Sequence, residues 1–434
     1  MTANAFKLRR QALAEHLPPH SVAIIPAAKE LLRNGDAHYR FRQHSDFYYL
    51  TGFQEPDAVL ILSAAPQSQS ILFTRPRRPS EEQWTGKRLG PEEASTVLGV
   101  DLAYSLEDLD AQLPEVFLDK KSIVYAIGQE HLWDERLIKA LHQAQSQLRS
   151  GVTAPDAMLD LVPMMGELRL KKTALEIELM REAARITVTA HQRAMRACRH
   201  LQYEYELEAE LLYEFFRHGS RAPAYDSIVA SGNNACTLHY TANDGPLTQG
   251  ELVLVDAGAE FRSYAADVTR TYPVNGTFSA EQRLIYDLVL TAQKAGIAAV
   301  RPGEPWDLAQ RVIVEIITQG LKDLNILKGD VQDLIAQQAY KPFYAHNSGH
   351  WLGLDVHDVG RYRLDEAWRA LEPGMVLTVE PGIYISEGME GVDPRWWGIG
   401  VRIEDDILVT AEGHDNLTAA LVSEAVEIEA FIRG

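Results

Sequence analysis

The stretch that decides the fold is residues 251–272, which reads Glu-Leu-Val-Leu-Val-Asp-Ala-Gly-Ala-Glu-Phe-Arg-Ser-Tyr-Ala-Ala-Asp-Val-Thr-Arg-Thr-Tyr. Two apolar runs flank a polar segment at residues 260–263, a pattern typical of an antiparallel hairpin that turns there. Asp256 ends the first run, and Asp267 lies in the middle of the second. We therefore expect these aspartates to face each other across the ladder, with Cβ atoms roughly 4.5–5.5 Å apart. Like charges so placed are destabilising unless a cation lies between them.

A second pair of carboxylates recurs near the C-terminus. Residues 374–384, Gly-Met-Val-Leu-Thr-Val-Glu-Pro-Gly-Ile-Tyr, and residues 398–406, Gly-Ile-Gly-Val-Arg-Ile-Glu-Asp-Asp, are predicted as two paired strands. Glu380 and Glu404 are equally distant from position 392 in the loop between them, so they too are expected to be cross-strand neighbours. One buried aspartate in a strand is more often a structural residue. Two aligned pairs in apolar strands instead predict one site for two divalent metal ions.

The nitrogen ligand of such a site is expected to be a histidine. His346, His350 and His357 lie in one segment, whose glycines permit the backbone to approach a ligand closely. His239 precedes the first hairpin and is a further candidate. Any single one of the 14 histidines is more often structural or exposed, so the residues alone leave this choice open.

Charge balance indicates the class of metal and of chemistry. Four carboxylates neutralise two divalent ions, with a bridging hydroxide as a further anion. An oxygen-rich set with one imidazole favours Mn²⁺, Co²⁺ or Zn²⁺ over metals that seek thiolates. Two such ions, about 3.5–4 Å apart, lower the pKa of a shared water and polarise a carbonyl. The pattern therefore predicts a hydrolase.

The composition is that of a globular protein of 434 residues, which predicts roughly 2–3 domains. The net charge of -19 opposes nucleic-acid binding. Two cysteines, Cys198 and Cys236, cannot build a disulfide framework and fit a reducing compartment. The N-terminus lacks the apolar stretch of a secretory signal, and the apolar runs are too short to span a bilayer. We expect a soluble, cytoplasmic protein with no membrane partner.

The order of elements changes near residue 170. Before it, strands and helices alternate, which predicts an α/β domain; the strands are expected at residues 21–25, 58–63, 70–74 and 122–126, and the helices at 8–16 and 132–148. Thr173 and Glu176 match a capping box that starts a long helix. The second half is predicted to be α+β, with helices at 204–218, 280–300 and 306–321 between hairpins.

These residues resemble those of a known family. The ordered set that carries the resemblance is Asp256, Asp267, His350, Glu380 and Glu404. It matches the metal ligands of the pita-bread metallopeptidases, family M24, and within them the aminopeptidase P group. Supporting motifs are Asp-Val-Thr-Arg-Thr at 267–271, His-Trp-Leu-Gly-Leu-Asp-Val-His-Asp at 350–358 and Val-Glu-Pro-Gly-Ile-Tyr at 379–384. Residues 39–53 and 84–90 resemble the N-terminal domain of that group, so the similarity covers nearly the whole chain.

The resemblance implies an α+β protein of two domains. Residues 1–170 would form a creatinase-like α/β N-terminal domain that serves oligomerisation and substrate access. Residues 171–434 would form the pita-bread catalytic domain. A homo-oligomer is implied, a tetramer or a dimer, in which the N-terminal domain approaches a neighbour's active site. Trp84 would contribute there.

The resemblance also assigns the metal ligands. Asp256 would chelate one ion, while His350 and Glu380 would hold the other. Asp267 and Glu404 would bridge both. Mn²⁺ is the expected metal, with Co²⁺ or Zn²⁺ as alternatives. All five ligand positions are filled, which argues against a metal-free member of the fold.

Four residues receive catalytic roles by the same resemblance. Glu380 would move a proton from the attacking water to the leaving amine. His239 and His357 would orient the substrate and stabilise the tetrahedral intermediate, and Arg402 would steady the carboxylates. Three aromatic residues near the ligands could wall a proline pocket, although core packing is the simpler interpretation of each; they are Tyr240, Trp351 and Tyr384.

The implied activity is that of an Xaa-Pro aminopeptidase, a metalloaminopeptidase acting on peptides with proline in second position. An Xaa-Pro bond is a tertiary amide without an N–H, so an enzyme that cleaves it cannot hold that N–H. A metal-bridging hydroxide that attacks the carbonyl does not need it. The alternatives are a prolidase restricted to Xaa-Pro dipeptides and a noncatalytic pita-bread protein that binds peptides. The complete ligand set opposes the noncatalytic alternative.

Overall fold

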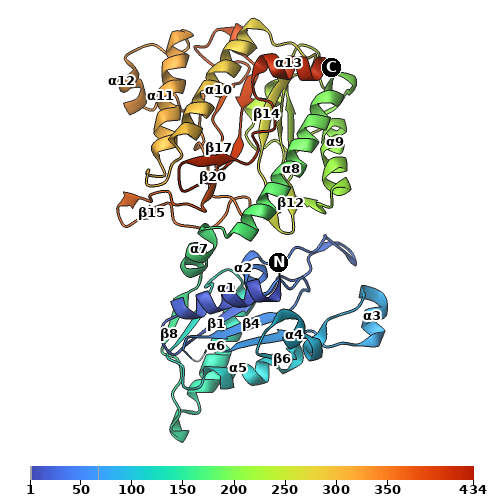
Figure 1. Ribbon diagram of the computed structural model, residues 1–434, viewed down its shortest axis with the longest axis vertical. Coiled ribbons are helices and arrows are strands. Elements are labelled where there is room, and N and C mark those ends of the chain that lie inside the picture. Colours follow the sequence, from blue (N-terminus) through green and yellow to red (C-terminus); the bar gives the residue numbers. More distant parts are fainter. Residues whose placement is uncertain (1, 67) are drawn as a thin grey trace. The chain divides into compact units, whose positions relative to one another are not determined.

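The computed structural model describes residues 2–66 and 68–434, and the chain divides into two compact units, Met1–Leu168 and Arg169–Gly434 (Figure 1). Each unit has a hydrophobic core of its own. Among the described residues, no helix combines the length and the apolar character needed to cross a bilayer.

The first unit is built on a six-stranded mixed sheet. Its strands, in spatial order, are β6 (Leu102–Ser105), β5 (Ser70–Thr74), β4 (Val59–Ser63), β1 (Ser21–Pro26), β7 (Ser122–Tyr125) and β8 (Ala157–Asp160). Strand β4 pairs antiparallel with both of its neighbours, and the remaining pairs are parallel. A short hairpin, β2 (Leu32–Asn34) and β3 (Ala37–His38), lies outside this sheet. The strands predicted for this half are all present.

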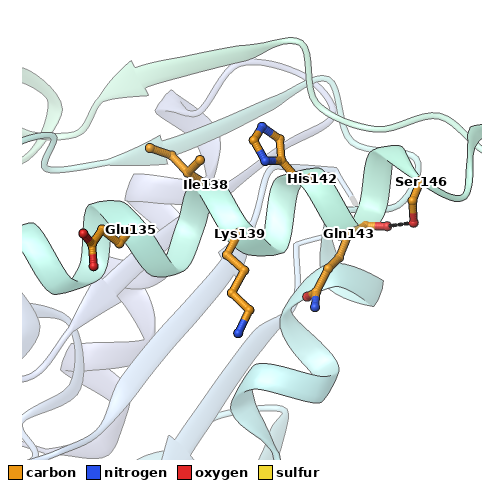
Figure 2. Close-up of a pocket in the computed structure, with 6 residues that line it drawn as sticks. All are labelled: Glu135, Ile138, Lys139, His142, Gln143 and Ser146. Atoms are coloured by element: carbon orange, nitrogen blue, oxygen red, sulfur yellow. Dashed lines mark hydrogen bonds between the residues drawn. The ribbon is translucent and has the colours of Figure 1, made fainter.

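Among the described residues of the first unit, several α-helices accompany this sheet before α7 begins. They are α1 (Ala3–His16), α2 (Ser45–Thr51), α3 (Pro79–Thr85), α4 (Gly90–Leu98), α5 (Leu109–Phe117) and α6 (His131–Gln145). In α6 the buried residues recur every three or four positions, so one stripe of the helix packs into the core. Figure 2 shows the opposite, exposed face, where a shallow hollow is lined by Glu135, Ile138, Lys139, His142, Gln143 and Ser146.

Helices of the second unit pack in pairs around its strands. They are α8 (Ala174–Ala197), α9 (Glu204–Arg217), α10 (Ala280–Ala299), α11 (Leu308–Asp323), α12 (Val331–Ala336) and α13 (Ala425–Arg433); α7 (Val162–Leu170) precedes them. Helices α8 and α9 contact each other, as do α10 and α11 (Figure 1). The predicted capping box of Thr173 and Glu176 is present. The Thr173 backbone N–H donates to Glu176 Oε2 at 2.9 Å, and the Thr173 hydroxyl donates to the same oxygen at 2.8 Å.

The strands of the second unit are short and form several small sheets. The first group comprises β9 (Ala222–Pro223), β10 (Ile228–Ser231), β11 (Leu252–Asp256), β12 (Ala259–Phe261), β13 (Tyr264–Ala265) and β14 (Thr269–Pro273). The second comprises β15 (Arg363–Leu364), β16 (Ala367–Trp368), β17 (Val376–Val379), β18 (Gly382–Ile385), β19 (Ile399–Arg402), β20 (Asp405–Val409) and β21 (His414–Asn416). The predicted α+β class is confirmed.

The register predicted for the first hairpin is wrong by two residues. Asp256 pairs with Thr269 rather than with Asp267, which lies in an irregular segment between β13 and β14. The turn consists of Arg262 and Ser263, with φ of 49° and 69°, so it falls further along the chain than expected. A slip of two positions keeps the same face of the hairpin. The two aspartates therefore still point toward one side.

The register predicted for the second hairpin is confirmed. Val379 pairs with Asp405 at the end of β17, and Gly382 pairs with Arg402 at the start of β18. The same register places Glu380 opposite Glu404. Each predicted strand is, however, two strands, and both glutamates lie where the ladder is interrupted.

A glycine opposite Asp267 sets how closely the first hairpin closes. A Cβ on Gly258 would lie 1.7 Å from the backbone oxygen of Ala266. Because a backbone atom cannot move aside cheaply, we expect Gly258→Ala to lower the free energy of unfolding by ~1–3 kcal/mol. Differential scanning calorimetry of the second unit's transition measures this. Gly413→Ala is the control, because its added Cβ meets nothing within 4 Å, and an equal loss in both variants would contradict the argument.

Candidate metal centre and active site

A cavity of about 530 Å³ in the second unit collects the predicted site residues. All eight of them line it: Asp256, Asp267, His239, His350, His357, Glu380, Arg402 and Glu404. They come from segments spread over more than 160 positions of the chain, from the loop before β11 to the break before β20. Folding thus brings together side chains that the sequence keeps far apart.

Three of the predicted ligands form a compact cluster. One donor atom each from Asp267, His350 and Glu404 lie within 4.8 Å of one another. The His350 Nε2 atom is 3.3 Å from Asp267 Oδ2 and 3.6 Å from Glu380 Oε1. Asp256 joins the cluster through Tyr225, whose hydroxyl lies 2.5 Å from Asp256 Oδ1 and 2.6 Å from Asp267 Oδ1.

Strand ends and breaks place these carboxylates. Asp256 is the last residue of β11, and Glu404 lies between β19 and β20. The Glu380 backbone N–H donates to Ser348 O at 2.9 Å, and the Glu404 N–H donates to Thr269 O at 3.1 Å. At each of these two strand breaks, the backbone of the predicted ligand is therefore held by a hydrogen bond to another segment of the site.

Burial of so many carboxylates perturbs their ionisation. Desolvation, together with the neighbouring Asp267 and Glu380 carboxylates, holds the pKa of Glu404 well above its ordinary value. Burial also raises the pKa of Glu380 to about 7. For His350, burial acts to lower the pKa, but the Asp267 and Glu380 carboxylates raise it to about 9. The cluster therefore favours added positive charge.

The donor set fits divalent metal ions. It offers four carboxylates and one imidazole, of which Asp256, Asp267 and Glu404 are buried, and among the described residues Arg402 supplies the one guanidinium that lines the cavity. Divalent cations would supply the missing positive charge, and oxygen-rich sets with one imidazole suit Mn²⁺, Co²⁺ and Zn²⁺. The cysteines lie elsewhere: Cys198 is buried in the core, and Cys236 does not line the cavity.

Arg402 contacts the cluster from strand β19. It donates from Nη2 to Asp256 Oδ2 at 2.7 Å and from Nη1 to the Tyr384 hydroxyl at 2.9 Å. Its Nε donates to Thr269 Oγ1 at 3.2 Å, and that hydroxyl in turn donates to Glu404 Oε2 at 2.6 Å. The guanidinium thus orients two carboxylates, one directly and one through a threonine that the sequence analysis did not single out.

His239 and His357 are exposed residues of the cavity wall. The ring of His357 lies 4.4 Å from that of His350, at an interplanar angle of 82°. Burial and the neighbouring His350 lower the pKa of His357, which favours its neutral form. His346, the remaining histidine candidate, lies 2.8 Å from the Tyr384 hydroxyl, and burial lowers its pKa to about 3.

The three aromatic residues suggested as walls of a proline pocket lie outside this cavity, and for Trp351 the simpler interpretation, core packing, agrees with its burial. Tyr240, Trp351 and Tyr384 are not among the residues that line this cavity. Trp351 is fully buried in the core, and the Tyr240 hydroxyl donates to Glu204. The tyrosines that line the cavity are Tyr225 and Tyr362. Tyr225 follows Pro223 and Ala224, with no apolar periodicity or motif around it, and no signal in the single sequence marked it.

Comparison with known proteins supports the same centre. Residues 178–411 match the model of metallopeptidase family M24, and residues 6–125 match the aminopeptidase P N-terminal domain. The chain is 47% identical to the Xaa-Pro aminopeptidase of Escherichia coli over 98% of this chain and 97% of that protein. The structure of Pseudomonas aeruginosa aminopeptidase PepP matches with a TM-score of 0.98 and 46% identity, over 100% of this chain and 98% of that one.

A further solved structure, Zn-substituted E. coli aminopeptidase P in complex with product, matches with a TM-score of 0.97 and 46% identity, over 100% of this chain and 98% of that chain. The predicted family and the predicted two-domain fold class are confirmed. The chain belongs to metallopeptidase family M24 and carries the N-terminal domain of aminopeptidase P.

Proposed function

We propose that the chain is a dinuclear-metal exopeptidase that hydrolyses the N-terminal Xaa-Pro bond of peptides. One observation carries the proposal: four carboxylates and one imidazole, contributed by distant segments, converge in a cavity that also presents two exposed histidines. The relatives named above are Xaa-Pro aminopeptidases, which supports the same activity.

The metal ions would be held by Asp256, Asp267, His350, Glu380 and Glu404. Mn²⁺ is the first candidate, and Co²⁺ or Zn²⁺ are alternatives that suit the same donors. When bound, two divalent ions activate a shared water and polarise the scissile carbonyl. The assignment of Asp267 and Glu404 as bridging ligands is part of this proposal, and their position within one compact cluster supports it.

Glu380 is suited to carry a proton. Burial raises its pKa to about 7, so the carboxyl can both accept and release a proton near neutral pH. It would take the proton of the attacking water and deliver it to the proline nitrogen that leaves. That nitrogen has no proton of its own in the peptide bond and must gain one.

The two exposed histidines, His239 and His357, would orient the substrate and stabilise the charge that develops on its carbonyl oxygen. A neutral imidazole carries one N–H donor, and the lowered pKa of His357 favours that form. A donor aimed at the carbonyl oxygen stabilises the negative charge that develops there. His239 would orient the peptide from the loop that precedes β11. Arg402 would act on the carboxylates rather than on the substrate, since its guanidinium donates to Asp256, Tyr384 and Thr269.

The first unit would serve oligomerisation and substrate access. Trp84 is 87% exposed on α3, which fits a role in contact with another subunit. A homotetramer, or failing that a homodimer, is part of the proposal. A cytoplasmic location is also proposed, and both cysteines are free, as expected in a reducing compartment.

Peptide length distinguishes the leading activity from its alternatives. After loading with Mn²⁺, we expect Xaa-Pro-Yaa tripeptides to be cleaved at the first bond with higher kcat/KM than Xaa-Pro dipeptides. Chromatography of the products measures both rates. Cleavage of dipeptides alone would indicate a prolidase, and tight binding of both without cleavage would indicate a noncatalytic peptide-binding protein.

Metal binding is expected to stabilise the protein more as pH rises. The ordinary pKa of Glu380 is 4.5 and burial raises it to about 7, so the metal-free fold loses stability as pH rises through this range. Bound cations offset that loss and release the protons. At 100 times the dissociation constant, Mn²⁺ should add about 2.7 kcal/mol.

Thermal melting with and without Mn²⁺, at about pH 5.5 and about pH 7.5, measures this effect. Asp267→Ala and Glu404→Ala should each abolish the metal-dependent shift and the hydrolysis. A shift of wild-type size in either variant would contradict its assignment as a bridging ligand.

Glu380→Gln tests the proton carrier. The amide keeps the shape of the side chain but cannot accept a proton, so kcat should fall by roughly 10²–10⁴-fold, the usual contribution of acid–base catalysis. Peptide binding, measured as KM or as the inhibition constant of a product dipeptide, should change far less. Metal content, measured by elemental analysis, separates this effect from ligand loss. An unchanged kcat would exclude the proton role.

A further inference from the structure

A buried ion cluster lies in the second unit outside the residues that line the cavity. Lys172 Nζ is 3.0 Å from Asp358 Oδ2, and Arg169 Nη2 is 2.5 Å from Asp358 Oδ1. The same Arg169 nitrogen is 2.7 Å from Asp355 Oδ2. The side chains of Lys172 and Asp358 are each 1% exposed, and that of Arg169 is 3% exposed.

Such a cluster is poorly explained by stability alone. Taking the three buried charges of Lys172, Arg169 and Asp358 out of water costs several kcal/mol per ion, and apolar residues of similar volume are often as stable or more so. Buried ion pairs are better attested where they select one conformation. The segment that this cluster holds is therefore the place to look for its role.

That segment connects two of the histidines that line the cavity. It begins at His350 and ends at His357, directly before Asp358. The Asp358 backbone N–H donates to Trp351 O at 2.9 Å, which closes the segment into a loop. A Cβ on Gly353 would lie 2.1 Å from Asp358 Oδ2 and 2.9 Å from Lys172 Cε. The glycine therefore gives the ion pair room inside the loop.

The loop sets the distance and the angle between the rings of His357 and His350. The two rings lie 4.4 Å apart and nearly perpendicular. Among the described residues, none forms a hydrogen bond with the His357 imidazole, so its position depends on the backbone that carries it. That backbone is anchored one residue later, at Asp358.

We propose that Lys172 and Arg169 are positioning residues that hold Asp358 and thereby aim His357 into the active-site cavity beside His350. The inference rests on the proposed function, in which His357 contacts the substrate carbonyl. Neither Lys172 nor Arg169 is among the residues that line the cavity.

Lys172→Met removes the cation and keeps most of the side chain. Misplacement by about 1 Å can cost about 10²-fold in rate, so we expect kcat on an Xaa-Pro-Yaa tripeptide to fall roughly 10–100-fold. KM and Mn²⁺ content should stay within about twofold, because the metal ligands are intact. Lys171→Met is the matched control: it is one position away, 51% exposed and paired with Glu372 at the surface. It should leave kcat unchanged.

A double-mutant cycle separates positioning from general damage. In a His357→Ala background, Lys172→Met should cost less than about twofold further, because the residue that it aims is already gone. A loss of equal factor in both backgrounds, or an unchanged kcat in the single variant, would overturn the inference. If Lys172→Met does not fold, Asp355→Asn enters the same cycle, because the 36% exposed Asp355 lies at the rim of the cluster.

The activity of the wild-type protein distinguishes a failure of the proposed function from a failure of the positioning role of Lys172 and Arg169. Failure of the Mn²⁺-loaded wild-type protein to cleave the tripeptide would overturn the proposed function and this inference with it. Cleavage by the wild type with full retention of kcat in Lys172→Met would overturn the inference and leave the proposed function intact.

Discussion

Mutual repulsion among buried carboxylates is the constraint on which the second unit depends. Desolvation and neighbouring negative charge raise the pKa of Glu404 and Glu380, so the cavity is unfavourable for the ionised cluster by itself. Protein groups offset part of this cost, through the Arg402 guanidinium and the Tyr225 hydroxyl. Bound cations would offset the rest. The electrostatic repulsion that raises these pKa values is the same property that favours the binding of cations.

The strands of both hairpins end or are interrupted at the four carboxylates. In a continuous strand, backbone N–H groups would be committed to the ladder. At the breaks they bond to other segments: Glu380 N–H to Ser348 O, Glu404 N–H to Thr269 O. Ser348 lies two positions before His350, so the first bond ties together two segments that carry predicted ligands. The same hydrogen bonds therefore satisfy buried backbone N–H groups and hold the segments of the site together.

The sequence predicted more of the second hairpin than of the first. Glu380 and Glu404 lie in long apolar runs around one central loop, and the observed pairing has the predicted register. For Asp256 and Asp267 the prediction depended on the position of a short turn. Arg262 and Ser263 adopt left-handed conformations, which are uncommon for both residue types. The sequence therefore did not indicate the position of the turn, and the predicted position was wrong. The aspartates still meet, because a slip of two positions preserves the face.

The sequence by itself predicted the candidate donor groups and their order, because carboxylates within apolar runs are visible in a single chain. Its motifs identified the family by resemblance, and the change in the order of elements near residue 170 indicated two domains. Only the tertiary structure decided which neighbours support those donors. Tyr225 and Lys172 contact the site or its loop from positions with no local pattern, and the motifs that contain Thr269 and Asp358 do not reveal the partners of these two residues. Periodicity records the face of one element, whereas such contacts depend on how separate elements pack together, which no local pattern encodes.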